Sequence, residues 1–376
     1  MRSALDTFKA ETQNYPLIDM KYYFTSESVS DGHPDKVADL ISDAVATYLI
    51  DKNPTHRAAV ETMVTTNSVT LAGEYKSDVD IDHIRTIVAN TINKIGYEQD
   101  GFDWRTFSFE NKLHGQSADI ALGTDDFGAG DQGLMFGYAC RETDNYMPLA
   151  ISLSHRILQR LREKTDLGPD MKSQVTVEYA GIGTPVRVDK VVCSVQHPED
   201  MSIETVRSIV RAQIEIELDD WIDEKTQFLI NPTGRFVIGG PDGDTGVTGR
   251  KIIVDTYGGY CPHGGGAFSG KDCTKVDRSA AYMARYLAKN LVAKNRATNC
   301  TVQLSYAIGV TEPTSLYVYA DGVVRPDLIK YINQRVDLTP KGIIDRFDLF
   351  NLDLTTTTNF GHFGRDDLPW EKLDLS

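Results

Sequence analysis

The sequence predicts an α+β protein in which one structural unit occurs three times. Two observations carry this prediction. The chain has 376 residues, 41% of them hydrophobic, which is enough for two or three domains with large cores. One order of elements, a helix, a hairpin and a second helix, recurs at intervals of about 120 residues. Such a two-layer unit leaves one sheet face uncovered. We expect that face to be covered either by packing the three units with their sheets inward or by pairing of sheets in a dimer.

The first unit begins with a helix at Pro34, because the fixed φ of proline suits the first helical position and its missing N–H would be unpaired there. Apolar residues recur at helical spacing as far as Tyr48. An alternating run over 57–75 predicts a β-hairpin that turns at 66–68. A second helix is expected over 81–94, which completes the unit.

The prediction of the second and third units rests only on the pattern of apolar residues, because the three units share negligible sequence identity. In the second unit we expect a helix over 151–163, strands over 174–180 and 187–196, and a helix over 203–218. In the third unit we expect a helix over 277–294, strands over 301–309 and 315–320, and a helix over 325–334.

Composition excludes several classes of function. The net charge of −15 argues against a general nucleic-acid binder, so any polyanion site must be a local cluster of Lys and Arg. The five cysteines are scattered and form no CxxC, which indicates neither a disulfide framework nor a zinc site. Neither a signal sequence nor an apolar run of membrane-spanning length is found. We therefore expect a cytoplasmic protein that binds neither nucleic acid nor membrane.

Two segments interrupt the repeated pattern. Residues 113–133 are rich in glycine and acids and lack periodicity, which is typical of a functional lid or of disorder. Residues 231–266 are dense in glycine, as expected where backbone wraps closely round a ligand, although tight turns explain part of this density. Within them, Arg250 and Lys251 precede the run IIVDTY, which resembles a strand.

The stretch GGGAFSGKDCTKVD, residues 264–277, contains three consecutive glycines and a fourth at Gly270, two lysines and two aspartates. Glycines let backbone N–H groups close on an anion, Lys271 and Lys275 supply positive charge, and Asp277 has the chemistry of a magnesium ligand. A Walker P-loop is excluded, because Asp272 stands where Ser or Thr is required and no hydrophobic strand leads in. Thr274 to Asp277 also has the form of a capping box, so a helix start is the simpler alternative.

Other charged residues can be interpreted either as functional residues or as ordinary helix-start and surface residues. His33, Asp35 and Lys36 at a helix start form a phosphate-and-metal corner, while an acid in the first turn is also favoured by the helix dipole. Glu61 and Glu74 lie on the two arms of the first hairpin, where solvated acids are common.

Four motifs then resemble one family. FTSESVSDGHPDK, GAGDQGLMFGYA, NPTGRFVIGGPDGDTGVTGRKIIVDTYGG and GGGAFSGKDCTKVDRSAAYMARYLAKN together resemble S-adenosylmethionine synthetase, or methionine adenosyltransferase, over nearly the whole chain. The resemblance implies three similar α+β domains about a pseudo-threefold axis. It also implies transfer of the adenosyl group of ATP to the sulfur of L-methionine, with hydrolysis of the released tripolyphosphate to pyrophosphate and phosphate. The implied boundaries are an extension over 1–21 and domains over 22–120, 127–237 and 238–372.

The resemblance also implies roles for individual residues. His33, Lys172, Arg250, Lys251 and Lys271 match catalytic positions. The ATP site adds Asp170, Arg235, Phe236, Asp244 and Ala267. The methionine site matches Glu74, Gln116, Asp131, Asp244, Lys275 and Ile308. Asp35 and Asp277 match ligands of Mg²⁺, with two ions expected per site, and Glu61 matches the acid at a K⁺ site.

The implied assembly is a homodimer with shared active sites, commonly paired into a homotetramer, and Gln116 would open a mobile lid over 116–130. From the residues alone, two other functions stay open. A Mg²⁺-dependent phosphotransferase or NTPase would use 265–271 as its phosphate loop and release ADP. A catalytically silent nucleotide-binding partner would be expected to lack His33, Asp35, Lys271 or Asp277, and all four are present.

Overall fold

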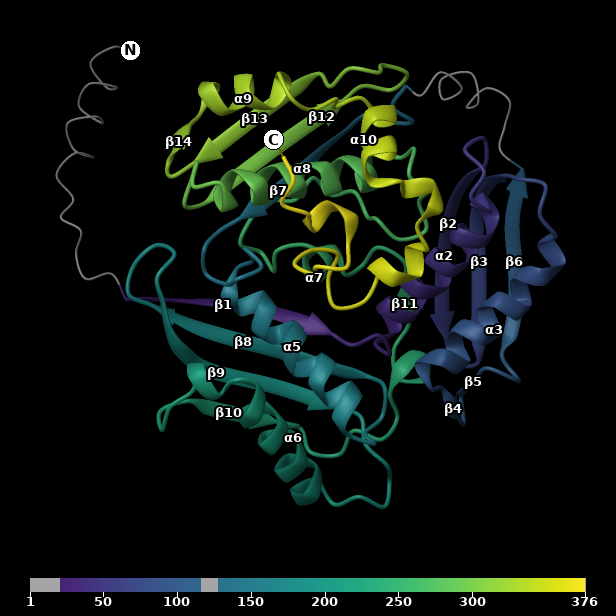
Figure 1. The fold of residues 1–376 in the computed structure, drawn as a ribbon. Coiled ribbons are helices and arrows are strands. Elements are labelled where there is room, and N and C mark those ends of the chain that lie inside the picture. Colours follow the sequence, from purple (N-terminus) through teal and green to yellow (C-terminus); the bar gives the residue numbers. More distant parts are fainter. Residues whose placement is uncertain (1–20, 116–127, 376) are drawn as a thin grey trace, which may run out of the picture.

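The computed structural model describes residues 21–115 and 128–375, which form three four-stranded sheets (Figure 1). A short two-stranded ribbon, β4 (Glu98–Gln99) with β5 (Phe102–Asp103), lies beside them. The first sheet has the strand order β11 (Gly246–Val247), β2 (Arg57–Thr65), β3 (Ser68–Lys76), β6 (Ser108–Gly115). The second sheet has the order β1 (Tyr22–Val29), β8 (Met171–Tyr179), β9 (Pro185–Val195), β10 (Gln227–Ile230). The third sheet has the order β14 (Val323–Val324), β13 (Ser315–Ala320), β12 (Cys300–Tyr306), β7 (Gly133–Ala139).

Each sheet takes one strand from a distant part of the chain. The expected hairpins β2–β3, β8–β9 and β12–β13 are antiparallel. The first strand of each hairpin pairs on its other side, also antiparallel, with an incoming strand: β11 with β2, β1 with β8, and β7 with β12. The repeated unit therefore has a third strand that is not local in sequence, and the three sheets are connected to one another by exchange of these strands.

Three helices cover the three sheets in the same way. The first helix of each unit packs on the hairpin and on the incoming strand, and a second helix follows the hairpin. The covering helices are α2 (Pro34–Ile50), α5 (Leu149–Lys164) and α8 (Val276–Ala293); the following helices are α3 (Ile84–Ile95), α6 (Ile203–Glu217) and α9 (Pro326–Asn333). None of the helices in the described ranges is both long and apolar enough to cross a membrane.

The predicted fold class and the repeated helix–hairpin–helix order are confirmed. Pro34 occupies the first turn of α2, and the hairpin turn falls at 66–67, as expected. One local prediction is wrong: the run after Lys251 is the helix α7 (Ile252–Asp255), not a strand. Four apolar residues are too few to distinguish the two by periodicity, and this run forms no pairing with a sheet.

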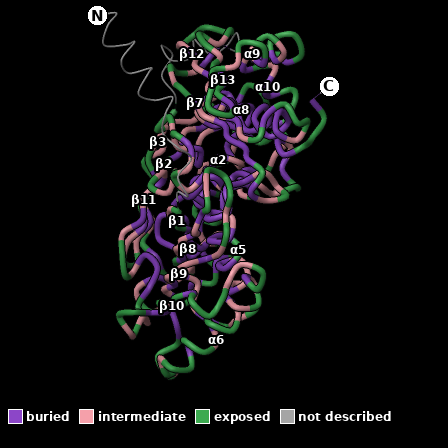
Figure 2. Tube along the Cα trace, turned by 90° about the vertical axis from the view of Figure 1, so that its left-hand side faces the viewer, coloured by how far each residue is buried: buried purple, intermediate pink, exposed green. Residues whose placement is uncertain are grey.

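The covering helices α2, α5 and α8 face the centre of the molecule and the sheets face outward (Figure 1). Most residues of α2 and α8 are buried on every side, and Figure 2 shows α8 largely in the colour of buried residues. By contrast, apolar side chains on the outer faces of all three sheets are exposed. Examples are Met63, Leu134, Leu229 and Tyr317. The arrangement with three sheets packed inward is therefore wrong, and residues 21–115 and 128–375 leave the outer sheet faces uncovered.

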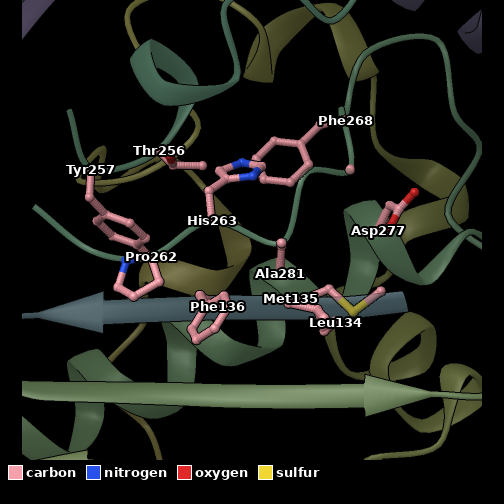
Figure 3. A pocket seen from close by; sticks show the side chains of 12 residues that line it. Leu134, Met135, Phe136, Thr256, Tyr257, Pro262, His263, Phe268, Asp277 and Ala281 are labelled. Carbon is pink, nitrogen blue, oxygen red and sulfur yellow. The ribbon is translucent and has the colours of Figure 1, made fainter. Parts of the chain in front are cut away.

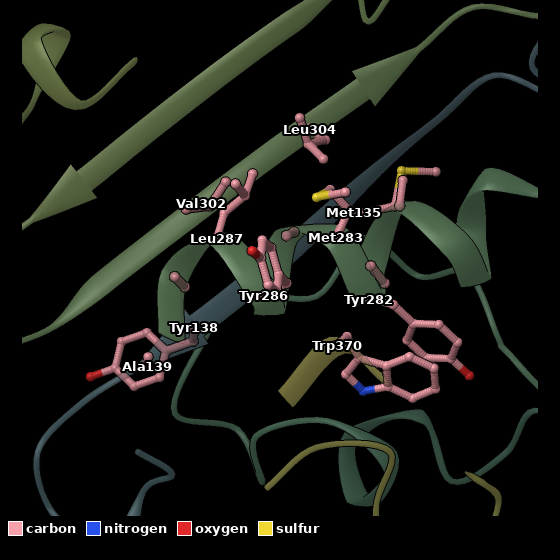
Figure 4. Close-up of a cluster of buried hydrophobic side chains, with 14 of the residues drawn as sticks. Met135, Tyr138, Ala139, Tyr282, Met283, Tyr286, Leu287, Val302, Leu304 and Trp370 are labelled. Carbon is pink, nitrogen blue, oxygen red and sulfur yellow. The ribbon is translucent and has the colours of Figure 1, made fainter. Parts of the chain in front are cut away.

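The C-terminal segment lies across the inner helices. After α10 (Pro340–Phe347), residues 348–375 run between α2 and α8 in short helical turns. Trp370 stacks on Tyr282 with 3.6 Å between ring centroids, and Figure 4 shows this pair below the layer formed by Met283, Leu287 and Val302. Glu371, fully buried, accepts a bidentate pair of hydrogen bonds from Arg285. This segment thus closes the space between the three units.

Candidate active site

The two ends of the glycine loop, residues 264–270, lie where no side chain would fit. A β-carbon on Gly264 would lie 1.7 Å from the carbonyl oxygen of Leu134. One on Gly270, which has φ +79°, would lie 1.9 Å from that of Val60. The loop is thereby held between β7 and β2, and its last carbonyl accepts a hydrogen bond from the Val60 N–H. Figure 3 shows the small pocket beneath it, with Asp277 at one end and the rings of His263 and Phe268 along it.

Lys271 and Asp277 form an ion pair at the end of this loop. Lys271 Nζ lies 2.6 Å from Asp277 Oδ2, and both side chains are about one-quarter exposed. The capping-box alternative is wrong: α8 has Lys275 at its N-cap, without a side-chain cap. The N–H and the hydroxyl of Thr274 instead donate hydrogen bonds to Asp272 Oδ1. Asp277 is thus free of a capping role.

Asp272 is a site-building residue that sequence reasoning used only to exclude a P-loop. It is fully buried, accepts a hydrogen bond from the Ala58 N–H at 2.8 Å, and pairs with Lys275 Nζ at 2.6 Å. Lys275 is thereby directed toward the first sheet. The sequence feature that could have identified Asp272 is its Asp-x-Thr spacing to Thr274, which is typical of a turn closed by an Asp side chain.

His33 caps the N-terminus of α2 as a neutral imidazole. Its Nδ1 accepts a hydrogen bond from the Asp35 N–H at 3.2 Å. Burial and the charge of Lys251 lower the pKa of His33 to about 3. Since Nδ1 is the acceptor, the single ring proton lies on Nε2, which makes that nitrogen a hydrogen-bond donor at neutral pH.

Asp35 connects this corner to the glycine-dense segment. It is only 2% exposed, pairs with Lys251, and accepts a hydrogen bond from the Val247 N–H at 3.0 Å. Arg250 Nε lies 3.5 Å from Asp35 Oδ1, the same oxygen that accepts the Val247 N–H, while Lys251 pairs with Oδ2. Burial acts to raise the pKa of Asp35, but the hydrogen bonds from Lys251 and Val247 outweigh it, so the pKa is below its ordinary value.

Lys36 points away from this corner, so the sequence-based inclusion of Lys36 in a phosphate-binding corner is wrong. Its Nζ is buried between Asp255 Oδ1 at 2.6 Å and Asp39 Oδ2 at 3.1 Å. Asp39 Oδ1 in turn accepts the Gly249 N–H at 2.8 Å. This buried cluster fixes the backbone directly before Arg250 and Lys251. The sequence feature that could have indicated this cluster is the spacing of Lys36 and Asp39, which lie three residues apart on one helix.

Asp170 and Lys172 lie at the start of β8, beside the same corner. Asp170 is buried and accepts the Gly240 N–H at 2.8 Å, and burial raises its pKa to about 6. The charges of Lys172, Asp244 and Lys251 all act on the pKa of Asp170, so these four residues lie close together.

Arg235 and Phe236 flank this group in the loop after β10. Arg235 is exposed and pairs with Glu199 at 2.5 Å. The Phe236 N–H donates to His197 Nε2 at 3.1 Å, a contact that the sequence did not indicate.

The remaining predicted residues lie on or beside strands of the first and third sheets, between which the glycine loop runs. Glu61 and Glu74 lie on the outer face of the first sheet, and burial raises the pKa of Glu61 although Lys271 acts to lower it. Asp131 and Ile308 are exposed near β7 and β12. Gln116 and most of the predicted lid, 116–127, lie outside the described residues.

The described residues thus form two groups, which we call the helix corner and the glycine-loop group. The helix corner contains His33, Asp35, Asp170, Lys172, Arg235, Phe236, Asp244, Arg250 and Lys251; the glycine-loop group contains Glu61, Glu74, Asp131, Ala267, Lys271, Lys275, Asp277 and Ile308. Backbone brings them near each other where Gly249 meets Ala267. Within 21–115 and 128–375, no hydrogen bond or ion pair joins a polar member of one group to one of the other.

The carboxylates fit a metal ion that is shared with phosphate oxygens. In the described part of the chain, no three His, Cys, Asp or Glu side chains are grouped so as to hold a metal by themselves. Mg²⁺, however, is commonly bound by one or two carboxylates together with substrate phosphates. Asp277 Oδ1 faces bare backbone, because a β-carbon on Gly266 would lie 2.3 Å from it. Asp35 and Asp277 each already hold a lysine, as expected where cations and carboxylates surround one anion.

Comparison with known proteins agrees with this chemistry. Sequence profiles of S-adenosylmethionine synthetase match the chain in three parts: the N-terminal domain over 21–118, the central domain over 126–236 and the C-terminal domain over 238–372. S-adenosylmethionine synthase of Paramagnetospirillum magneticum is 52% identical over 376 aligned residues, covering 94% of this chain and 97% of the relative.

Two further relatives show the same likeness. S-adenosylmethionine synthase of Zymomonas mobilis is 52% identical, covering 94% of this chain and 97% of its own length. S-adenosylmethionine synthase 2 of Rhodospirillum rubrum is 51% identical, covering 94% of this chain and 96% of its own. The chain therefore belongs to the S-adenosylmethionine synthetase family, the methionine adenosyltransferases, which make S-adenosylmethionine from ATP and L-methionine.

Proposed function

We propose that the helix corner and the glycine-loop group together hold ATP as an adenosyl donor whose whole triphosphate chain is the leaving group. The observation that carries this proposal is the pair of Lys–Asp contacts, Lys251 with Asp35 and Lys271 with Asp277. Each places a cation that suits phosphate beside a carboxylate that suits magnesium. When the substrate binds, the lysines turn from the carboxylates to phosphate oxygens.

The chemistry needs electrostatics more than acid–base catalysis. The methionine sulfur is a neutral nucleophile and attacks C5′ in line, so no general base is required. Negative charge grows on O5′ and the leaving tripolyphosphate, and preorganised donors lower that barrier. His33 Nε2–H is a neutral donor suited to O5′, while Arg250, Lys251 and Lys271 neutralise the phosphates. The same cations then hold tripolyphosphate for hydrolysis to pyrophosphate and phosphate.

The other roles follow the family resemblance. Family members use a divalent metal ion and potassium. We assign two Mg²⁺ ions to Asp35 and Asp277 and K⁺ to Glu61; bound magnesium would supply charge neutralisation at the phosphates. The nucleoside lies by Asp170, Lys172, Arg235, Phe236 and Asp244, with Ala267 at the phosphates. L-Methionine lies by Glu74, Gln116, Asp131, Asp244, Lys275 and Ile308.

We also propose a homodimer with shared active sites, paired into a homotetramer. Glu61, Glu74 and Lys172 all project from the outer faces of sheets, beside exposed apolar residues such as Met63 and Leu134. A two-fold interface on these faces would bury that apolar surface and set the helix corner of one protomer against the glycine-loop group of its partner. This supports the alternative in which sheets pair between chains.

A heterodimer experiment tests the shared site. Lys251→Ala and Lys271→Ala chains carrying different tags are co-expressed, and the mixed dimer is purified. If the site is shared, one site of the mixed dimer contains both substitutions and the other contains neither, so about half of wild-type activity returns. S-Adenosylmethionine, pyrophosphate and phosphate are measured by mass spectrometry. A mixed dimer as inactive as its parents would place each site within one chain, and ADP as the product would refute the triphosphate leaving group.

A further inference from the structure

A buried ion pair adjoins the glycine loop and belongs to neither group of site residues. Asp43 of α2 and Arg278 of α8 are 0% and 1% exposed. The two terminal nitrogens of Arg278 donate to the two carboxylate oxygens of Asp43 at 2.6 Å and 3.1 Å. A buried pair of this kind is by itself weak evidence for stability, because well-packed apolar residues often replace it without loss. Its role is therefore better sought in the groups that it holds.

The pair holds the backbone of the chain around Lys271. Asp43 Oδ1 accepts a hydrogen bond from the Gly270 N–H at 2.8 Å. Arg278 Nη1 donates to the carbonyl oxygens of Phe268 and Lys271, at 3.0 Å and 3.1 Å. Strand β2 also pairs with this turn. These contacts fix the point from which the Lys271 side chain leaves the loop.

Two threonines of the C-terminal segment complete the hydrogen bonds of the pair. The Thr358 hydroxyl donates to Asp43 Oδ2 at 2.6 Å. The Thr357 oxygen accepts from Arg278 Nη2 at 2.9 Å, since its own proton is donated to the Leu354 carbonyl at 2.8 Å. Both threonines are 0% exposed. A continuous chain of hydrogen bonds thus runs from the C-terminal segment, through the buried pair, to the backbone of the glycine loop.

The same buried pair supports both members of the exchangeable ion pair. Lys271 is held through its carbonyl oxygen, and Asp277, whose carboxylate lies 2.6 Å from Lys271 Nζ, directly precedes Arg278 on α8. Precise placement matters for a group that acts on a leaving anion, because a shift of about 1 Å can cost about 10²-fold in rate. A loosened pair would therefore displace a catalytic charge without removing it.

We propose that Thr357 and Thr358 are positioning residues for Lys271 and act through Asp43 and Arg278. The proposal rests on the proposed role of Lys271 at the leaving triphosphate. The two hydroxyl groups fix the side chains of the buried pair, and the pair fixes the turn that carries the lysine. The C-terminal segment is in this way part of the catalytic machinery, although its threonines act on the substrate only through other residues.

A double-mutant cycle with the full-length enzyme tests this coupling. Thr358→Val removes the hydroxyl and keeps the branched shape. We expect kcat for S-adenosylmethionine formation to fall about tenfold, with the KM for methionine little changed. Thr358→Ser keeps the hydroxyl and should restore most of the rate. In the Lys271→Ala background, Thr358→Val should lower kcat further by less than about twofold, because the lysine that it positions is gone.

A second variant and a matched control lie beside Thr358 in the chain. Thr357→Val takes one acceptor from Arg278 and should show the same pattern with a smaller loss, so it tests the proposal independently of the stability of Thr358→Val. Thr356→Val makes the same change at an exposed position, where the hydroxyl donates only to the Asp353 carbonyl. It should keep the wild-type kcat. All assays are run below the unfolding temperature measured for each variant.

The outcomes separate this inference from the proposed function. A merely structural role of Thr358 would lower kcat by the same factor in the wild-type and Lys271→Ala backgrounds, which overturns the inference. A wild-type kcat in folded Thr358→Val overturns it as well. A wild-type kcat in Lys271→Ala would instead refute the proposed role of the lysine.

Discussion

The two Lys–Asp pairs of the candidate site share one chemistry and differ in their surroundings. Asp35 has a side chain only 3% exposed and is held by Lys251, Arg250 and the Val247 N–H. Asp277 is 25% exposed and, among the residues that the structure describes, is held by Lys271 alone, with one oxygen facing the bare backbone of Gly266. The first pair is fixed by many contacts, and the second is free to exchange partners.

The two Lys–Asp ion pairs therefore have different roles in the protein. A buried carboxylate that loses its cation is left uncompensated, so the helix corner contributes to folding as well as to binding. A partly exposed pair contributes little to stability because water and salt screen it. The glycine-loop group can therefore rearrange round a changing phosphate charge with little effect on the fold.

The largest expected effect tests the exchangeable pair. Lys271→Ala should lower kcat by about 10²–10³-fold, because its charge matters most as the leaving group separates. The KM for methionine should change little. Steady-state kinetics with both substrates varied measures this split. A rise in the KM for methionine alone, with kcat unchanged, would place Lys271 in the methionine site instead.

The next effect contrasts the two carboxylates directly. Asp35→Asn should destabilise the ligand-free protein by about 2–4 kcal/mol, because Lys251, whose side chain is only 16% exposed, loses its counter-charge in a largely buried setting. Asp277→Asn should cost less than about 1 kcal/mol. Urea unfolding of both variants without nucleotide or metal gives the comparison. Equal losses of stability would show that burial does not distinguish the pairs.

A pH effect follows from the cluster beneath the helix corner. Burial raises the pKa of Asp39 to about 7, since it more than offsets the attraction of Lys36. Between about pH 4 and 7 the native state therefore binds a proton that the unfolded state has lost, so this group makes stability fall as pH rises through that window. Asp39→Asn keeps an acceptor for the Gly249 N–H and should flatten this part of the profile. Parallel profiles of wild type and variant would contradict the raised pKa.

The smallest effect concerns an exposed pair at the edge of the helix corner. Glu199→Ala releases Arg235, and both side chains are mostly exposed. We expect a change in stability below about 0.5 kcal/mol and a KM for ATP that is unchanged or slightly lower. Thermal unfolding and ATP kinetics measure it. A loss of more than about 1 kcal/mol would show that the pair stabilises the fold.

Local patterns predicted the elements well. Pro34 marked the start of α2, and the alternating run over 57–75 predicted β2 and β3. The lysines and acids of both groups were chosen from their residue types and from the family resemblance, and their roles remain predictions. Lys36 was misassigned because sequence shows that a lysine follows Asp35 but not that the helix turns it inward to Asp255.

The sequence by itself determined the three helix–hairpin–helix units and the residue types of the site, because helix period, strand alternation and turn residues are local properties. The tertiary structure decided which strand completes each sheet and which face of each unit turns inward. Strands β1, β7 and β11 pair with hairpins far along the chain, and such pairing depends on which surfaces meet after folding. Burial of α2 and α8 then fixed which lysines reach solvent and which stay in the core.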